Sequence, residues 1–494
     1  MKKNIYQTLI FASLLMLVGC SDFLDRQPLD QLTTENFYQD EAQVDLALIG
    51  VYATMQDVEW IGKGWMITEI PSDNSQAGGT DPDFTPIDNF AVTADNIPVA
   101  NYWAFHYRQV TLANTVIPKV EEMDLEQAKK DPLIAEARFL RALAYFDLVR
   151  VYGEVPLITK PPVFGDDLLY PRTDVNEVYD LIKSDFEFAA EHLPLQWSGS
   201  KAGRATKGAA LGFLAKVYLT TRDYTKSRDA ALEVMNLGIY ELEEDYADNF
   251  ELDKSDNNIE SVFQIQFTGC GPFGTGNALQ AFFAPWGEGI TKDRDGWGSQ
   301  IPTAPIVNNP NTTIVDAFEP DDLRKNPTVM TGNVHYPTIN AEDGGYTYPS
   351  TGASASISNI KKYVVGSGPN ICFMSTPQNF HVIRYSDILL TYAESIMEIE
   401  GGISSNALAL NAFNKVRMRA GLDELNEIDK EILLQERRVE FAFEGHRWFD
   451  LLRSGRTVEI LTLHGKNPDI NKLLFPIPAS EIEVNPNLEQ NPGY

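Results

Sequence analysis

Apolar residues recur at helical spacing through most of this chain. Over residues 35–56, for example, Val44 and Leu48 fall on one face of a helix. The same spacing predicts helices over residues 132–152, 174–193, 205–237, 385–400, 405–420 and 428–444. Trp103 and Tyr107 lie four residues apart on one further predicted helix, and we expect both in the core. The pattern therefore indicates a mainly α protein.

One predicted helix–turn–helix unit, residues 205–237, has the spacing of a tetratricopeptide hairpin. Its packing positions hold Ala215, Tyr218 and Ala231, and the positions 178 residues later hold Ala393, Ile396 and Ala409. The repetition predicts two such hairpins in one scaffold. Generic packing of helical hairpins is the alternative explanation.

Two stretches lack this periodicity. Residues 60–100 are rich in Gly, Asp, Pro and Thr and predict a long loop. A strand is expected where Phe263 and Ile265 alternate with glutamines, and residues 268–380 after it predict short strands and ordered loops. We therefore expect one domain over residues 35–494, in which a helical scaffold carries two loop-rich insertions.

The first residues have the pattern of a lipoprotein signal. Lys2 and Lys3 precede an apolar run that is too short to span a bilayer, and Leu17-Val18-Gly19-Cys20 resembles a bacterial lipobox. We predict a signal peptide over residues 1–19, lipid on Cys20, and a polar tether over residues 20–34. An ordinary secretory signal is the alternative.

Composition narrows the classes of partner. The formal net charge of −30 argues against binding to nucleic acid and against adhesion to anionic lipid headgroups. Besides Cys20 there are two cysteines, Cys270 and Cys372, which can pair in an oxidising compartment. The sequence leaves open whether they do.

Several acidic and histidine residues invite an enzymatic interpretation. Glu444, His446 and Asp450 have the residue types of acid–base catalysis, but Arg437 and Arg438 nearby favour an ion-pair network. The histidines lack the spacing of a zinc site, and no dinucleotide or phosphate-binding motif occurs, so we expect no cofactor. Calcium binding stays open. The oxygen ligands for it would come from Asp81 with Asp83 and from Asp293 with Asp295, neither of which has EF-hand spacing.

The loop-rich stretches combine aromatic and polar residues in the way that a carbohydrate site requires. A sugar has an apolar C–H face, which stacks on a flat ring, and a rim of hydroxyls, which binds carboxylate, amide or guanidinium groups. The candidate ligand-binding residues are Asp73, Asn74, Phe90, Trp286, Arg294, Trp297 and Tyr346. The alternative is that the aromatic residues only pack their own loops.

Six blocks of sequence, in order, resemble the SusD/RagB family of outer-membrane lipoproteins. The blocks are the lipobox with Phe23–Asp25, residues 136–156, residues 384–394, residues 416–422, residues 436–451, and the ending at 475–478 and 485–494. Together they extend over essentially the whole chain.

The resemblance implies a tetratricopeptide-like α-α superhelix with a loop-rich ligand domain. It also implies a non-enzymatic, cell-surface lipoprotein that captures oligosaccharide or polysaccharide and delivers it to a SusC-like TonB-dependent transporter in the outer membrane. Asp73 and Asn74 match a polar position of the family, with Phe90 and Trp286 nearby. Trp297 lies in a family-like Gly-Trp-Gly run, for which a structural role is equally expected. The alternatives are a surface glycoside hydrolase, a structural lid for a transporter, and a peptide binder.

Overall fold

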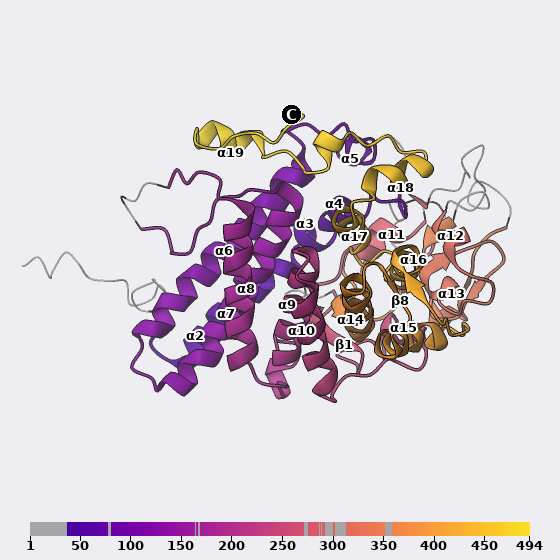
Figure 1. The fold of residues 1–494 in the computed structure, drawn as a ribbon, viewed down its shortest axis with the longest axis horizontal. Helices are drawn as coiled ribbons and strands as arrows, with labels where there is room; N and C mark the ends of the chain where they lie inside the picture. Colours follow the sequence, from indigo (N-terminus) through magenta and orange to yellow (C-terminus); the bar gives the residue numbers. More distant parts are fainter. Residues whose placement is uncertain are drawn as a thin grey trace, which may run out of the picture.

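The computed structural model describes residues 37–77, 81–163, 165, 168–270, 275–285, 287, 289–291, 300–301, 313–350 and 358–494. Long helices pack one against the next along the chain and form a curved scaffold (Figure 1). Its members are α2 (Glu41–Ala53), α6 (Ile97–Glu122), α7 (Gln127–Tyr152), α8 (Val175–His192), α9 (Lys207–Thr220), α10 (Tyr224–Asn236), α14 (Tyr385–Ile399) and α15 (Ala407–Arg419). The predicted mainly helical architecture is confirmed.

The two predicted hairpins are α9–α10 and α14–α15, and helix α10 packs on α14. The side chain of Thr206 accepts a hydrogen bond from the Ala209 N–H at the start of α9, and Asp223 caps α10 in the same way. All six packing residues expected from the repeat are buried. The four alanines among them let the helices approach closely, so the repetition reflects a real structural repeat.

The prediction of a loop is wrong for the first part of residues 60–100. Helices α3 (Val58–Ile61) and α4 (Gly64–Thr68) occupy its beginning, and α5 (Thr85–Asp88) follows. Residues 60–75 are buried apart from a half-exposed Lys63. Helices of four or five residues are too short to show periodicity, so the sequence pattern did not reveal them.

The second insertion begins and ends on neighbouring strands. Strand β1 (Ser261–Ile265) pairs antiparallel with β7 (Phe380–Arg384). A disulfide joins Cys270, shortly after β1, to Cys372, shortly before β7. Between these points lie short strands, as expected, and short helices. They are α11 (Leu279–Phe283), β2 (Gln300–Ile301), α12 (Ile314–Ala317), α13 (Lys325–Thr328), β3 (Val329–Met330), β4 (His335–Tyr336), β5 (Tyr346–Thr347) and β6 (Ser358–Ile360).

The C-terminal part of the chain follows the second insertion and the hairpin α14–α15. Strands β8 (Ile403–Ser404) and β9 (Ile428–Asp429) pair, and the helices that follow are α16 (Lys430–Glu440), α17 (Arg447–Ser454), α18 (Thr457–Leu463) and α19 (Ala479–Val484). The tail then runs across one end of the N-terminal helices (Figure 1). Within the described ranges, no helix has both the length and the apolar character needed to cross a bilayer.

Candidate functional site

Four of the predicted functional residues lie outside the described part of the chain. They are Cys20, Trp286, Arg294 and Trp297, and the acidic pair Asp293 and Asp295 lies there too. Their assignments stay predictions.

Asp73 and Asn74 are buried beneath the C-terminal helices. The Arg447 guanidinium donates two hydrogen bonds to the Asp73 carboxylate, at 2.7 and 2.8 Å, and Arg438 lies 3.1 Å from the same carboxylate. Arg438 Nε also donates to the Asn74 side-chain oxygen at 2.9 Å. Burial alone would raise the pKa of Asp73, but the charges of Arg438 and Arg447 outweigh it and hold the pKa well below its usual range. In this arrangement both side chains join the first insertion to α16 and α17.

Glu69, next to this cluster, has the opposite protonation preference. Its Oε1 accepts hydrogen bonds from Asn74 Nδ2 and from the Phe443 N–H, both at 3.1 Å. Its Oε2 is buried without a partner. Burial raises the pKa of Glu69 to about 7, because desolvation of the carboxylate outweighs the hydrogen bonds from Asn74 and Phe443 and the charge of Lys362. A carboxylate and a protonatable carboxyl therefore lie four residues apart in one buried cluster.

Of the predicted aromatic residues, Phe90 and Tyr346 lie in the described structure. The Phe90 ring centroid lies 6.1 Å from that of Trp448, and Phe90 is 8% exposed, with a left-handed backbone at φ 55°. Tyr346 lies on β5, is only half-buried, and meets Tyr348 edge-on with centroids 6.5 Å apart. Tyr346 thus keeps part of its surface exposed, whereas Phe90 is buried against Trp448 of α17.

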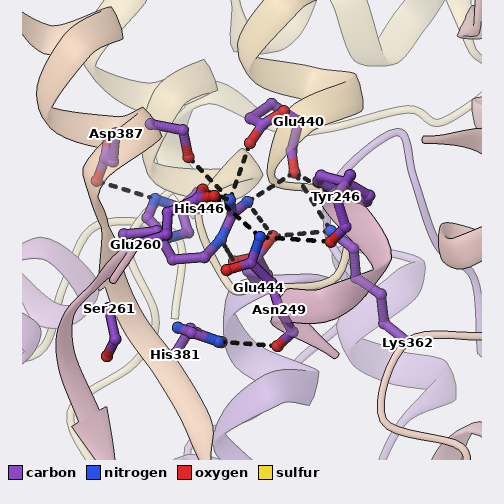
Figure 2. A network of polar contacts seen from close by, with 12 residues as sticks. Tyr246, Asn249, Glu260, Ser261, Lys362, His381, Asp387, Glu440, Glu444 and His446 are labelled. Atoms are coloured by element: carbon purple, nitrogen blue, oxygen red, sulfur yellow. Dashed lines mark hydrogen bonds and ion pairs between the residues drawn. The ribbon is translucent and has the colours of Figure 1, made fainter. Parts of the chain in front are cut away.

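A second buried cluster is centred on Arg384, at the junction of β7 and α14. Its guanidinium contacts Glu260 at 2.5 Å, Glu440 at 2.9 Å and Glu444 at 2.8 Å. Figure 2 shows these three glutamates gathered around one centre. Arg419 also contacts Glu260 and Glu440. The cluster links β1, β7 and α16, and so fixes the base of the second insertion to the scaffold.

The predicted ion-pair network around Glu444, His446 and Asp450 is confirmed. Arg437 donates to Asp450 at 2.9 Å, and Lys362 Nζ lies 2.7 Å from Glu444. Burial raises the pKa of Glu444, but Arg384 and Lys362 outweigh it and bring the pKa to about 2. Burial, reinforced by Lys216, lowers the pKa of His446 to about 3. At neutral pH this histidine is uncharged beside a charged carboxylate.

Among the residues with described positions, no group of three or more His, Cys, Asp or Glu side chains has the arrangement of a metal site. A cavity of about 100 Å³ lies between the scaffold and the C-terminal helices. Sequence reasoning missed this cavity, because its walls come from segments far apart in the chain.

These observations define a class of protein: a tetratricopeptide-like helical scaffold that carries a loop-rich domain on a disulfide-closed base. Residues 260–494 match the SusD family, and residues 22–219 match a family described as starch-binding and associating with the outer membrane. A SusD-like protein of Bacteroides ovatus is 31% identical over 471 residues, which span 90% of this chain and 81% of that protein. The chain belongs to the SusD family.

Solved structures agree with this assignment. One, determined with xylogluco-oligosaccharide, is 28% identical and has a TM-score of 0.77, covering 89% of this chain and 97% of its own. A laminarin-binding SusD-like protein is 26% identical and has a TM-score of 0.76, covering 92% of this chain and all of its own. The fold therefore extends over both the scaffold and the insertions.

Proposed function

We propose that this protein is a cell-surface lipoprotein that binds oligosaccharide and delivers it to a SusC-like TonB-dependent transporter. The observation that carries the proposal is the likeness, over 89% of the chain, to a structure determined with xylogluco-oligosaccharide. The lipobox at Cys20 supports attachment to the outer membrane by lipid, since two or three acyl chains hold a protein firmly.

We propose the second insertion as the main ligand-binding surface. Tyr346 is half-buried there and supplies an aromatic face, and the prediction for Trp286, Arg294 and Trp297 places more aromatic and polar groups on the same insertion. Asp73, Asn74 and Phe90 are buried, which favours a role in supporting the ligand loops over direct contact with sugar. Calcium ligation by Asp81 with Asp83, or by Asp293 with Asp295, remains a separate prediction.

Calorimetry tests this site directly. The protein should bind xylogluco-oligosaccharide, laminarihexaose or another neutral oligosaccharide, and Trp286→Ala and Tyr346→Ala should each weaken binding by at least roughly 2- to 12-fold, which corresponds to the 0.5–1.5 kcal/mol of an aromatic stacking contact. Tyr170→Ala removes a partly exposed tyrosine outside both insertions and should leave affinity unchanged. Binding of peptides alone would overturn the proposed ligand class.

A surface glycoside hydrolase is the alternative from another class. Glu69 and Asp73 have the separated pKa values that such an enzyme needs in its acid and its base. Both side chains are buried, however, and the Asp73 carboxylate is already paired with Arg438 and Arg447. We therefore propose binding without hydrolysis, and release of reducing sugar by the purified protein would contradict it.

The anchor and the transporter need their own experiments. Cys20→Ala should remove the protein from the outer-membrane fraction, whereas Cys270→Ser should leave it there. Affinity purification of the wild-type protein should recover a TonB-dependent transporter. If Trp286→Ala and Tyr346→Ala left both binding and uptake unchanged, a purely structural lid would be the better account.

A further inference from the structure

Two partners with opposite requirements meet at one ring nitrogen of His106. This histidine lies on α6 and has no exposed surface. Trp60, on α3 of the first insertion, donates its indole N–H to His106 Nε2 at 3.0 Å. Asp147, on the scaffold helix α7, places a carboxylate oxygen 3.2 Å from the same nitrogen. One nitrogen is thus shared between the first insertion and the scaffold.

The other ring nitrogen limits the forms that the imidazole can take. His106 Nδ1 lies 2.6 Å from the carbonyl oxygen of Tyr102, one turn earlier on α6. A carbonyl oxygen can only accept a hydrogen bond, so Nδ1 carries a hydrogen. The ring is therefore either neutral, with a lone pair on Nε2, or positively charged, with a hydrogen on both nitrogens.

Each of these two forms satisfies only one of the two partners. In the neutral ring, Nε2 accepts the hydrogen bond from Trp60, but its lone pair faces the carboxylate of Asp147. In the charged ring, Nε2–H donates to Asp147 but faces an indole N–H, which can only donate. Because neither form makes both hydrogen bonds, the addition of a proton to Nε2 exchanges one bond for the other.

Asp147 itself stays ionised in this exchange. Burial alone would raise the pKa of Asp147, but the hydrogen bond from His106 and the charge of Arg150 outweigh it and hold the pKa below its usual range. Arg150 contacts the second carboxylate oxygen at 2.5 Å. Asp147 is 8% exposed and lines the cavity beside α7, so a proton from solvent can reach the buried ring through its carboxylate.

Few ionisable groups compete for this proton. Besides Asp147 and Arg150 of α7, Tyr102 of α6 faces the imidazole, with ring centroids 4.1 Å apart. Burial raises the pKa of Tyr102 well above its usual range, so its hydroxyl stays neutral. Helices α2, α3 and α4 also pack on α6, and within the described ranges none of them brings an ionisable side chain into hydrogen-bond contact with the ring. The proton on Nε2 therefore decides which partner is bound.

The exchange moves a hydrogen bond from one interface to another. The bond between Trp60 and His106 joins α3 to α6, whereas the bond between His106 and Asp147 joins two long scaffold helices that already pack on each other. Helix α3 has only four residues, so it depends on side-chain contacts of this kind. Protonation should therefore loosen α3 and leave the scaffold intact.

We propose that His106 is a proton-operated switch that loosens the first insertion from the scaffold as the pH falls. When the ring is neutral, Trp60 holds α3 on it. When the ring is charged, it pairs with Asp147, and the indole N–H of Trp60 is released. The switch is separate from the glycan site proposed above and requires neither the ligand loops nor the transporter.

Hydrogen exchange and NMR of the full-length chain, labelled at the histidine rings, test this inference. Between about pH 8 and pH 5, the interval in which histidine is the usual side chain to change charge, His106 should pass from the neutral Nδ1–H form to the charged form. Over the same interval the protection factors of the α3 amides should fall about 2- to 12-fold, the value of one hydrogen bond.

Two variants should shift the switch in opposite directions. Asp147→Asn removes the carboxylate that favours the charged ring, so at a given pH a smaller fraction of His106 should be charged and α3 should stay protected. Trp60→Phe removes the donor that favours the neutral ring, so a larger fraction should be charged. A purely structural effect would not move the two in opposite directions. If Asp147→Asn does not fold, the direction of the change in Trp60→Phe decides.

Trp197→Phe is the matched control, because the Trp197 indole N–H donates to the Ala205 carbonyl oxygen and to no histidine. It should leave the charge of His106 and the protection of α3 unchanged. Glu69 also gains a proton in this interval, but this relieves a buried charge and would raise protection. Measurements in the Glu69→Gln background remove that effect. The inference is overturned if, in that background, α3 protection does not fall towards pH 5, if His106 keeps one form throughout, or if Trp60→Phe lowers its charged fraction.

Discussion

Arg447 holds the Asp73 carboxylate with two hydrogen bonds, although the residues lie 374 positions apart in the chain. This contact fixes the first insertion to the C-terminal helices. Lys466 adds to it by donating to the carbonyl oxygens of Ile70 and Ser75. Residues 70–75 of the first insertion are thus tied to the C-terminal part at several points.

Asp73→Asn should therefore act on stability. The change leaves Arg438 and Arg447 buried without a carboxylate, which should lower the free energy of unfolding by about 3–5 kcal/mol. Urea denaturation measures this loss. Asp229→Asn, which breaks the exposed pair with Arg228, should change stability by less than about 1 kcal/mol. Weaker glycan binding with unchanged stability would instead assign Asp73 to direct ligand contact.

Glu69 should make stability depend on pH. Its pKa is raised from 4.5 to about 7 by burial, so below pH 4.5 the carboxyl is neutral in both folded and unfolded chains and has no effect. As pH rises from 4.5 to 7 the unfolded chain ionises first, and the folded state loses up to about 3 kcal/mol. Glu69→Gln should thus be more stable than the wild type at pH 8 and equal to it near pH 4.

Denaturation of both proteins across this pH range provides the measurement. Glu122→Gln, on an exposed glutamate, should follow the wild-type curve. A Glu69→Gln protein that is less stable than the wild type at pH 8 would show that the ionised carboxylate is stabilising.

Replacing Arg384 should destabilise the protein more than replacing an exposed arginine. Arg384→Met leaves Glu260, Glu440 and Glu444 buried with reduced compensation, so unfolding should become easier by about 3–5 kcal/mol. Arg456→Met, which removes a cation that pairs with exposed Glu459, should cost less than about 1 kcal/mol. Similar losses in the two variants would contradict the importance given to burial.

The disulfide should stabilise the second insertion. Cys270 and Cys372 close a loop with a sequence separation of 102, and removing such a link typically lowers the free energy of unfolding by roughly 2–5 kcal/mol. The double variant Cys270→Ser/Cys372→Ser should show this loss in urea denaturation and faster proteolysis within residues 268–380. Dithiothreitol should destabilise the wild type and leave the double variant unaffected.

Much of the scaffold was predictable because helical periodicity is a local property. The pairs α9–α10 and α14–α15 follow from the spacing of Ala215, Ala231, Ala393 and Ala409, whose small side chains had to face neighbouring helices. The ion pairing of Asp450 was also predictable, since its partners Arg437 and Arg453 lie in the same segment, whereas Glu444 pairs with the distant Arg384. The sequence resemblance added the family, which the comparisons confirm.

The tertiary structure alone decided which residues meet across the chain. Asp73 and Asn74 have the polar character of ligand contacts, yet their partners Arg438 and Arg447 follow more than 360 residues later. The pairing of Cys270 with Cys372 and the cavity between the scaffold and the C-terminal helices also depend on distant segments. Spacing along a helix or strand specifies which face a residue occupies, but only the packing of those faces determines whether it meets solvent, a ligand or a buried charge.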